Sequence, residues 1–115
     1  MKYSESLKKT QDFQVVYKQG ISYANKYLFM HVRENYLNKN RIGISISKKV
    51  GNSVSRHHLA RLIREGYRLQ EKLFYIGYDI VIVVRVNGKN CTYHEIECAI
   101  YHLGKMHQIV KKNLV

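Results

Sequence analysis

The segment from residue 42 to residue 86 limits the possible folds most strongly, because two strand patterns flank one long helical pattern. Apolar residues alternate over 42–46, which predicts a strand with one buried face. The β-branched run over 78–86 predicts a strand that is covered on both faces and lies in the middle of a sheet. A helix of about five turns fits between them, so we expect a βαβ unit with a parallel pair of strands. General packing rules make such a crossover right-handed.

Two further helices are predicted, one near each end of the sequence. The first is capped by Thr10 and ends at Gly20. The second begins at a capping box formed by Thr92 and Glu95. Its apolar stripe is expected to run to the C-terminus and contains Ile96, Ala99, Ile100, Leu103 and Val110.

A second alternating strand is predicted over 27–33, and the polar turn at 35–40 indicates that it pairs with the strand at 42–46 as an antiparallel hairpin. The pattern also permits a short extra strand near Ser22. The order of elements is therefore α-β-β-α-β-α. In a chain of 115 residues, this order predicts a single domain over 1–115, an α+β or α/β sandwich with a central mixed sheet.

The charge balance indicates an anionic partner. Lys and Arg number 20 against 8 Asp and Glu, which gives a formal net charge of +12. Such an excess favours nucleic acid as the partner. The first residues are polar, and no apolar run approaches the ~20 residues of a membrane span. We therefore expect a soluble, cytoplasmic protein that does not bind membranes and is monomeric when isolated.

The long helix carries a cationic face. Five basic side chains share one arc of its helical wheel, with no acidic residue among them: Arg56, His57, Arg61, Arg64 and Arg68. The apolar residues on the other side are Leu59, Leu62, Ile63, Leu69 and Leu73. A solvated helix face is the ordinary alternative, but the arginine forks and the net charge favour contact with phosphates of nucleic acid. After a sharp turn at Gly51, the N–H groups of residues 53–56, beside Lys48 and Lys49, are expected to face an anion.

Aromatic side chains define a second candidate surface. Phe13 and Tyr17 lie one turn apart on the first helix, and Phe29 and His31 lie on the strand face opposite the apolar one. If the helix packs beside that strand, the four side chains form a groove in which unpaired bases can stack. Core packing is the competing interpretation, and for Phe13 alone it is the stronger one.

The sequence offers little for catalysis by protein side chains. It contains no GxSxG, HExxH or Walker motif, and Asp12 and Glu65 are expected to pair with the basic residues beside them. Cys91 and Cys98 match no redox or zinc spacing and are expected to be reduced thiols. We assign no catalytic residue, and any protein ligands to a metal remain unknown.

The run RIGISISKKVGNSVSR at 41–56, followed by RLIRE at 61–65, resembles the signature of the protein subunit of bacterial ribonuclease P. Weaker matches occur in the same order at 7–13, 16–20 and 78–85 and in the closing helix. The resemblance implies a sandwich like one domain of a ribosomal protein, with a left-handed crossover. It also implies a ribonucleoprotein in which an RNA subunit holds the catalytic Mg²⁺ and removes the 5′ leader of precursor tRNA. The protein would bind the leader and the catalytic RNA.

The resemblance places contact with catalytic RNA on the cationic helix and the loop before it. The residues expected to contact RNA are Lys48, Lys49, Asn52, Ser53, Arg56, His57, His58, Arg61, Arg64 and Arg68. The residues expected to line the leader cleft are Phe13, Tyr17, Phe29 and His31. Where the family has an Arg-Asn-Arg run, this chain has Arg56 followed by His57 and His58, and Ala60 replaces the family's usual lysine. A leader base preference therefore does not carry over, and we expect binding at the two imidazoles to strengthen at mildly acidic pH.

Two other functions stay open at this point. A ribosomal or general RNA-binding protein would bind RNA tightly without any dependence on a 5′ leader. A protein that cleaves RNA unaided is disfavoured by the shortage of placed carboxylates and paired histidines.

Overall fold

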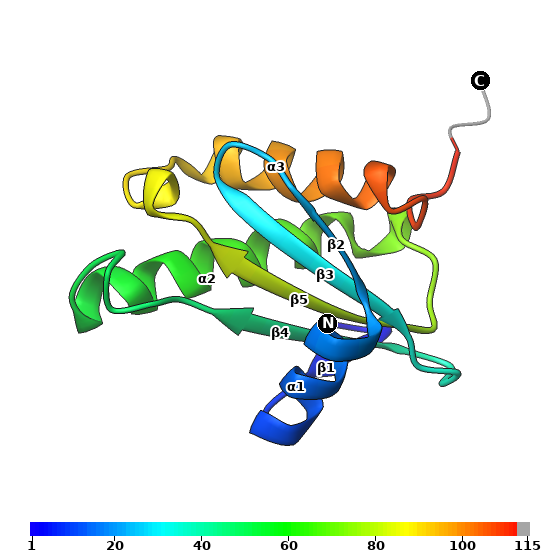
Figure 1. Cartoon of the computed structure of the whole chain (residues 1–115). Helices are drawn as coiled ribbons and strands as arrows, with labels where there is room; N and C mark the ends of the chain where they lie inside the picture. Colours follow the sequence, from blue (N-terminus) through cyan, green and yellow to red (C-terminus); the bar gives the residue numbers. More distant parts are fainter. Residues whose placement is uncertain (113–115) are drawn as a thin grey trace.

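Within residues 1–112, five strands form one mixed sheet in the order β1-β4-β5-β3-β2, with α1 on one face and α2 and α3 on the other (Figure 1). The structure is a computed structural model that describes residues 1–112, so residues 113–115 of the predicted domain lie outside it. The elements follow the chain as β1 (Ser4–Ser6), α1 (Thr10–Gln19), β2 (Ile21–Ala24), β3 (Leu28–Glu34), β4 (Asn40–Ser45), α2 (Ser53–Gln70), η1 (Glu71–Leu73), β5 (Tyr78–Val84), η2 (Val86–Gly88) and α3 (Tyr93–Met106).

The strand β5 lies at the centre of the sheet, as its continuous apolar run predicts. It pairs in parallel with β4, which confirms the βαβ unit, and antiparallel with β3. The predicted hairpin between β3 and β4 is wrong, because β5 lies between them and gains burial on both faces there. The turn that joins β3 to β4 crosses the start of β5. In that turn the backbone N–H of Asn35 donates to the oxygen of Gly77 (2.8 Å), and its side chain donates to Asp79 (2.9 Å).

The crossover from β4 through α2 to β5 is left-handed. In Figure 1 the arrows of β4 and β5 point the same way, β5 lies above β4, and α2 passes behind both. The general preference for right-handed crossovers therefore does not hold for this unit, whereas the handedness implied by the resemblance does.

Two apolar clusters hold the helices on the sheet. The larger lies between the sheet and the pair α2 and α3, and its members include the fully buried Leu28 and Ile80. The smaller fixes α1 to the other face through Leu7, Val16 and Val81. Full burial of such a side chain contributes on the order of 1.5–3 kcal/mol. The position of α1 therefore depends on a few side chains, which matters because α1 carries part of the candidate site.

The helix ends agree with the sequence predictions in part. Thr10 is the first residue of α1 rather than its cap, because Lys9 occupies the cap position, without a side-chain hydrogen bond. Gly20 ends α1 as predicted, and a Cβ at Gly20 would lie 2.5 Å from a backbone oxygen of the helix. The capping box of Thr92 and Glu95 at the start of α3 is confirmed.

The apolar stripe of α3 does not reach the C-terminus. The helix ends at Met106, and Gln108 adopts a positive φ of 61° that turns the chain back. Val110 therefore lies outside the helix and forms a bridge with Phe74. The short strand near Ser22 is present as β2.

The apolar side of α2 differs from the predicted arc. Leu69, near its end, and Leu73, in η1, are 58% and 40% exposed, whereas Tyr67 and Gln70 are buried. The buried side of the helix is therefore rotated toward Tyr67, and two leucines remain on the surface. Within residues 1–112, no helix is long and apolar enough to span a membrane.

Candidate nucleic-acid interface

The first turn of α2 is held by Asn52, which occupies the N-cap position. Its Oδ1 accepts a hydrogen bond from the backbone N–H of Ser55 (2.8 Å), and its backbone oxygen accepts one from the N–H of Arg56 (2.9 Å). Of the four N–H groups predicted to face an anion, two are therefore used inside the helix. The N–H groups of Ser53 and Val54 remain for a ligand.

The loop before this turn exposes Lys48 and Lys49 and is anchored by Val50, which is buried in the larger core cluster. Gly51 does not have the positive φ that a sharp glycine turn would require. A Cβ at Gly51 would lie 3.0 Å from the Cβ of Ser55. Gly51 therefore permits a close approach to the helix instead of the expected turn, and the two lysines still lie beside the helix start.

The cationic face of α2 is exposed along most of its length. The exposed basic side chains are His57, His58, Arg61, Arg64 and Arg68. Glu65 accepts hydrogen bonds from Nε and Nη2 of Arg68, which lower the pKa of Glu65. The expected pairing of Glu65 is confirmed, but an acidic residue does lie beside the arc. Arg61 and Arg64 form no ion pair among residues 1–112, so they remain available to an anion.

A hollow of about 240 Å³ lies between α2 and the carboxyl end of β4. Its lining residues are Ile44, Ile46, Ser53, Arg56, His57, Ala60 and Arg64. Arg56 is half-buried, and its Nε–H is buried with no hydrogen-bond acceptor among the described residues. A buried donor without an acceptor costs about 1–3 kcal/mol. The hollow therefore suits an anionic group that brings oxygen acceptors.

Three of the four predicted aromatic residues contact one another. The ring centroids of Phe13 and Tyr17 are 6.4 Å apart, and Tyr17 meets His31 edge to face at 4.9 Å. Gly43 permits this packing, because a Cβ there would lie 2.7 Å from Cζ of Phe13. Burial lowers the pKa of His31, which favours the neutral form of its ring. Phe13 is half-buried, in part as the core interpretation predicted, whereas Tyr17 and Phe29 are 41% and 37% exposed.

Phe29 lies two residues before His31 on the same face of β3 and contacts a cation. The guanidinium carbon of Arg85 is 4.9 Å from the centroid of the Phe29 ring, and its Nη1 donates to the backbone oxygen of Asn25 (2.6 Å). Our sequence interpretation did not assign Arg85 to this surface. The sheet register explains its position: Phe29 pairs with Val83 on β5, so Arg85 follows on the same face. We refer to Phe13, Tyr17, Phe29, His31 and Arg85 as the aromatic surface.

A buried ion network fixes α1 beside this surface. The carboxylate of Asp79 is fully buried and accepts two hydrogen bonds from Arg41 (2.7 Å each) and one from Asn35 (2.9 Å), with Arg33 at 3.4 Å. Arg41 also lies 3.8 Å from Asp12 on α1. Asp12 therefore pairs with a basic residue, but this partner comes from β4 and not, as the sequence predicts, from the residues beside Asp12 on its helix. Burial alone would raise the pKa of Asp79, but the hydrogen bonds from Arg41 and Asn35 and the nearby positive charges hold it below its usual value.

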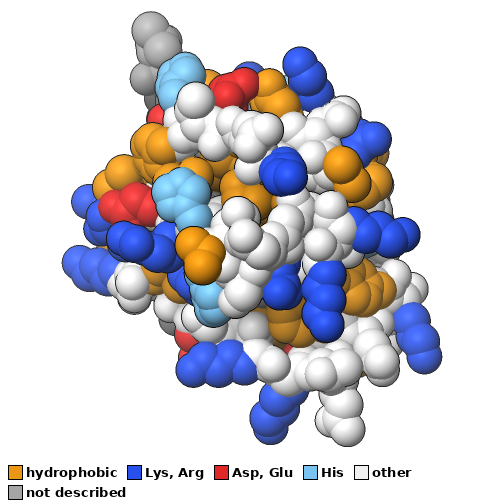
Figure 2. Space-filling view, turned by 90° about the vertical axis from the view of Figure 1, so that its left-hand side faces the viewer, with side chains coloured by type: hydrophobic (Ala, Val, Ile, Leu, Met, Phe, Trp, Pro, Cys, Tyr) orange, Lys and Arg blue, Asp and Glu red, His pale blue; other side chains and the backbone are white. Residues whose placement is uncertain are grey.

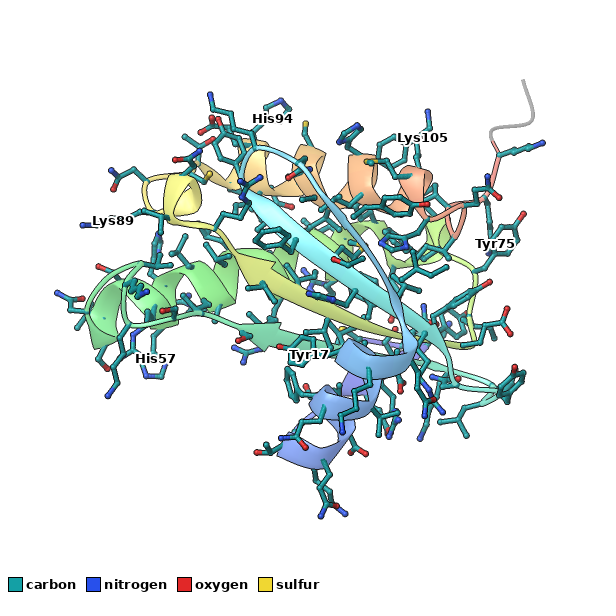
Figure 3. The ribbon with its side chains drawn as sticks, in the orientation of Figure 1. Tyr17, His57, Tyr75, Lys89, His94 and Lys105 are labelled. Carbon is teal, nitrogen blue, oxygen red and sulfur yellow. The ribbon has the colours of Figure 1, made fainter. Side chains whose placement is uncertain are left out.

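The aromatic surface and the cationic face lie on two sides of β4. Figure 2 views the end of the molecule where α2 begins, and Lys and Arg side chains are spread across this end while Asp and Glu are few. In Figure 3, His57 lies on α2 and Tyr17 on α1, with β4 between them. The structure therefore brings both candidate sets to one region of the molecule.

The described residues do not form a metal site. Within residues 1–112, no group of three or more His, Cys, Asp or Glu side chains lies close enough to hold a metal ion. Cys91 and Cys98 are both free thiols, as predicted, one buried and one exposed.

The mixed sheet, the left-handed crossover and the pairing of a cationic helix with an aromatic surface define a class of small basic α+β proteins whose surface suits nucleic acid. The family model described as Ribonuclease P matches residues 1–108 of this chain. The chain belongs to the ribonuclease P protein family.

Individual relatives agree with this assignment. The ribonuclease P protein component of Lachnoclostridium phytofermentans is 56% identical over 110 residues, which are 96% of this chain and 95% of the relative. The Staphylococcus aureus RNase P protein has the same fold, with a TM-score of 0.84 at 33% identity over 92% of this chain and 97% of that one. The Thermotoga maritima RNase P protein also has this fold, with a TM-score of 0.82 at 27% identity. The match covers 88% of this chain and 96% of that one.

Membership of this family makes the chain the protein part of a ribonucleoprotein endoribonuclease that acts in tRNA processing, with ribonuclease P RNA as its partner. The predicted fold, a mixed-sheet sandwich, is confirmed by the solved structures of relatives.

Proposed function

We propose that this chain binds the 5′ leader of precursor tRNA on its aromatic surface and the catalytic RNA on the cationic face of α2. It thereby promotes Mg²⁺-dependent endonucleolytic removal of the leader, which yields the mature 5′ end of the tRNA. The observation that carries this proposal is the placement of the two surfaces on either side of β4 in a member of this family.

The leader, as a single strand, has unpaired bases that can stack on exposed rings. Tyr17 and Phe29 supply such rings, and Arg85 supplies a positive charge beside them. Stacking of this kind contributes on the order of 1–3 kcal/mol per base and tolerates different sequences. The aromatic surface therefore suits a leader whose sequence varies among tRNA precursors.

The catalytic RNA would meet the cationic face through its phosphates. Arg61 and Arg64 pair with no carboxylate among residues 1–112, so contact with phosphate does not require them to break an ion pair. The hollow at Arg56 would accept a phosphate oxygen and satisfy its buried Nε–H. Arginine forks bind phosphate with two parallel hydrogen bonds, which fixes orientation as well as affinity.

In this proposal Mg²⁺ is held by the RNA subunit and the substrate, since the described residues of the chain do not form a site for it. The chain contributes fixed positive charge instead. That charge offsets repulsion between the phosphates of leader and catalytic RNA, so less Mg²⁺ is needed to bring them together.

The test is cleavage of a tRNA precursor by a bacterial ribonuclease P RNA at low Mg²⁺, with and without this protein. We expect cleavage at the mature 5′ end only when both are present, and a larger increase in affinity for a precursor with a long leader than for one with a single leader nucleotide. Tight RNA binding without stimulation and without leader dependence would refute the proposal and favour a general RNA-binding protein.

A third arm contains the protein alone. A mutant of the S. aureus RNase P protein is described as having defective mRNA degradation activity, so this arm includes a messenger RNA as well as the precursor. We expect no cleavage by this chain alone, because Asp12, Glu65 and Asp79 near the two surfaces are all engaged by arginines and are poorly placed to act as a base.

A further inference from the structure

The end of the molecule away from the start of α2 carries lysines and tyrosines that the proposed function does not use. In Figure 3, Tyr75 and Lys105 lie at this end, and His57 and Lys89 lie at the other. The 18 residues of α2 separate the two ends, which corresponds to about 27 Å along the helix axis. A ligand at this far end would therefore make contacts separate from those of the cationic face.

The backbone at this end is fixed by pairing with the segment that follows α3. The N–H of Tyr75 donates to the oxygen of Ile109 (2.8 Å), and the N–H of Lys111 donates to the oxygen of Leu73 (2.6 Å). Gly104 allows the segment after α3 to approach the helix closely, because a Cβ at Gly104 would lie 2.6 Å from Cγ2 of Val110. The backbone that carries the lysines and tyrosines near this segment is therefore fixed by hydrogen bonds.

A hollow of about 720 Å³ opens between these elements. Among the residues that the structure describes, its lining contains three lysines and two tyrosines and no acidic residue. These lining residues are Tyr75, Tyr101, Lys105, Gln108, Val110, Lys111 and Lys112. Nζ of Lys105 lies 5.5 Å from the centroid of the Tyr101 ring. Tyr75 is 46% exposed, so its ring is open to a ligand in a hollow that is also lined by three lysines.

The carboxylates beside the hollow are already engaged. Glu71 is buried and accepts hydrogen bonds from the backbone N–H groups of Lys2 (3.0 Å) and Tyr3 (3.2 Å). Glu97 accepts a hydrogen bond from the hydroxyl of Tyr93 (2.9 Å). Neither carboxylate pairs with a lysine of the hollow, so within residues 1–112 no ion pair neutralises the positive charge there.

We propose that this hollow is a second binding site for unpaired RNA, in which Tyr75 stacks on a base and Lys105 and Lys111 pair with the adjoining phosphates. Exposed rings flanked by cations are the means by which proteins hold single-stranded nucleic acid. A protein partner would instead be expected to cover the exposed Leu69 and Leu73 nearby, which do not line this hollow. The site goes beyond the proposed function, which assigns no RNA to this end of the molecule.

The experiment is a titration of the full chain with tetrauridylate, followed by the NMR shifts of its backbone amides. We expect the amides of Tyr75, Lys105 and Lys111 to shift with their own dissociation constant, independent of the amides at the start of α2. Tyr75→Ala and Lys105→Gln should each weaken this site about fivefold or more and leave the constant measured on α2 unchanged. The spectra of the variants report directly whether the fold is intact.

A matched control removes the same charge elsewhere. Lys26 lies over the ring of Tyr27 at 5.3 Å, much as Lys105 lies over Tyr101, so Lys26→Gln should leave the affinity at the second site unchanged. Equal weakening by Lys26→Gln and Lys105→Gln would overturn the proposal in favour of a general charge effect. Absence of shifts at this end, or unchanged affinity in Tyr75→Ala, would also overturn it and leave the surface to a protein partner. The titration involves neither catalytic RNA nor cleavage, so its failure is distinct from failure of the proposed function.

Discussion

Replacement of Asp79 by asparagine is expected to lower the free energy of unfolding by about 3 kcal/mol. The substitution keeps the size of the side chain and removes the charge that Arg41 and Arg33 face. Removal of one partner from a buried ion pair costs about 3–5 kcal/mol, because the remaining charge stays desolvated. The two arginine side chains are 23% and 27% exposed, so water can partly solvate them and the lower end of this range applies.

The same loss can be expressed as a shift in melting temperature. For a chain of this length, a loss of about 3 kcal/mol corresponds to a decrease in Tm of ~12 °C. A matched control is Glu65→Gln, since Glu65 also accepts two hydrogen bonds from one arginine but is exposed. Because solvent screens such surface pairs, this control should leave the free energy of unfolding nearly unchanged.

The charge of Asp79 also predicts that the free energy of unfolding depends on pH. Its pKa is lower in the folded protein than in the unfolded chain, so the carboxylate stabilises the fold above the unfolded value of about 3.9. This stabilisation is lost as the pH falls from the pKa of Asp79 in the unfolded chain through its lower pKa in the folded protein. The difference in stability between the protein and Asp79→Asn should therefore be constant from pH 5 to pH 7 and shrink below about pH 4.

Urea unfolding followed by circular dichroism, repeated across this pH range, measures both effects. A loss smaller than about 1 kcal/mol at pH 7, or a loss equal to that of Glu65→Gln, would show that the buried network does not hold the sheet as the structure indicates. A difference that persists unchanged at pH 3 would refute the assignment of the effect to the charge of Asp79.

Three further substitutions test other parts of the structure. Arg64→Ala should weaken binding of catalytic RNA and reduce the slope of log affinity against log salt by about 0.7–0.9. Arg68→Ala should change the slope less, because Arg68 already pairs with Glu65. An unchanged slope in Arg64→Ala would remove Arg64 from the contacts. Gly43→Val should displace the Phe13 ring, cost about 1–3 kcal/mol in urea unfolding, and weaken leader binding more than binding of catalytic RNA in filter-binding assays. Thr92→Ala removes the α3 cap and should cost about 1 kcal/mol in the same unfolding assay, with RNA affinity unchanged.

Elements with strong local patterns could be predicted from the sequence. The continuous apolar run of β5 predicts a central strand because only a position covered on both faces buries all of it. The capping box at Thr92 is equally local, since its two hydrogen bonds join residues three apart. The placement of most candidate residues in the fold could be predicted for the same reason, because Arg61 and Arg64 share a helix face and Tyr17 follows Phe13 by one turn.

Features that depend on distant neighbours could not be predicted. The polar turn at 35–40 resembles a hairpin turn, and nothing local shows that β5 will lie between the strands it joins. The strand β1 has only three residues, two of them exposed, and so lacks an alternating pattern. Arg85 joins the aromatic surface only through the register of β5 with β3, and the exposure of Leu69 follows from the rotation of α2 on the sheet.

The central position of β5 also sets the distance between the β3 residues of the aromatic surface, Phe29 and His31, and the strand that leads into the cationic helix. Neighbouring strands lie about 4.8 Å apart, so β3 and β4 are separated by ~10 Å, twice the value that a hairpin would give. The rings of β3 and the helix that follows β4 cannot change this separation without breaking the backbone hydrogen bonds of the sheet. The protein would therefore act as a rigid spacer, which fixes how far the leader lies from the catalytic RNA for every precursor that it binds.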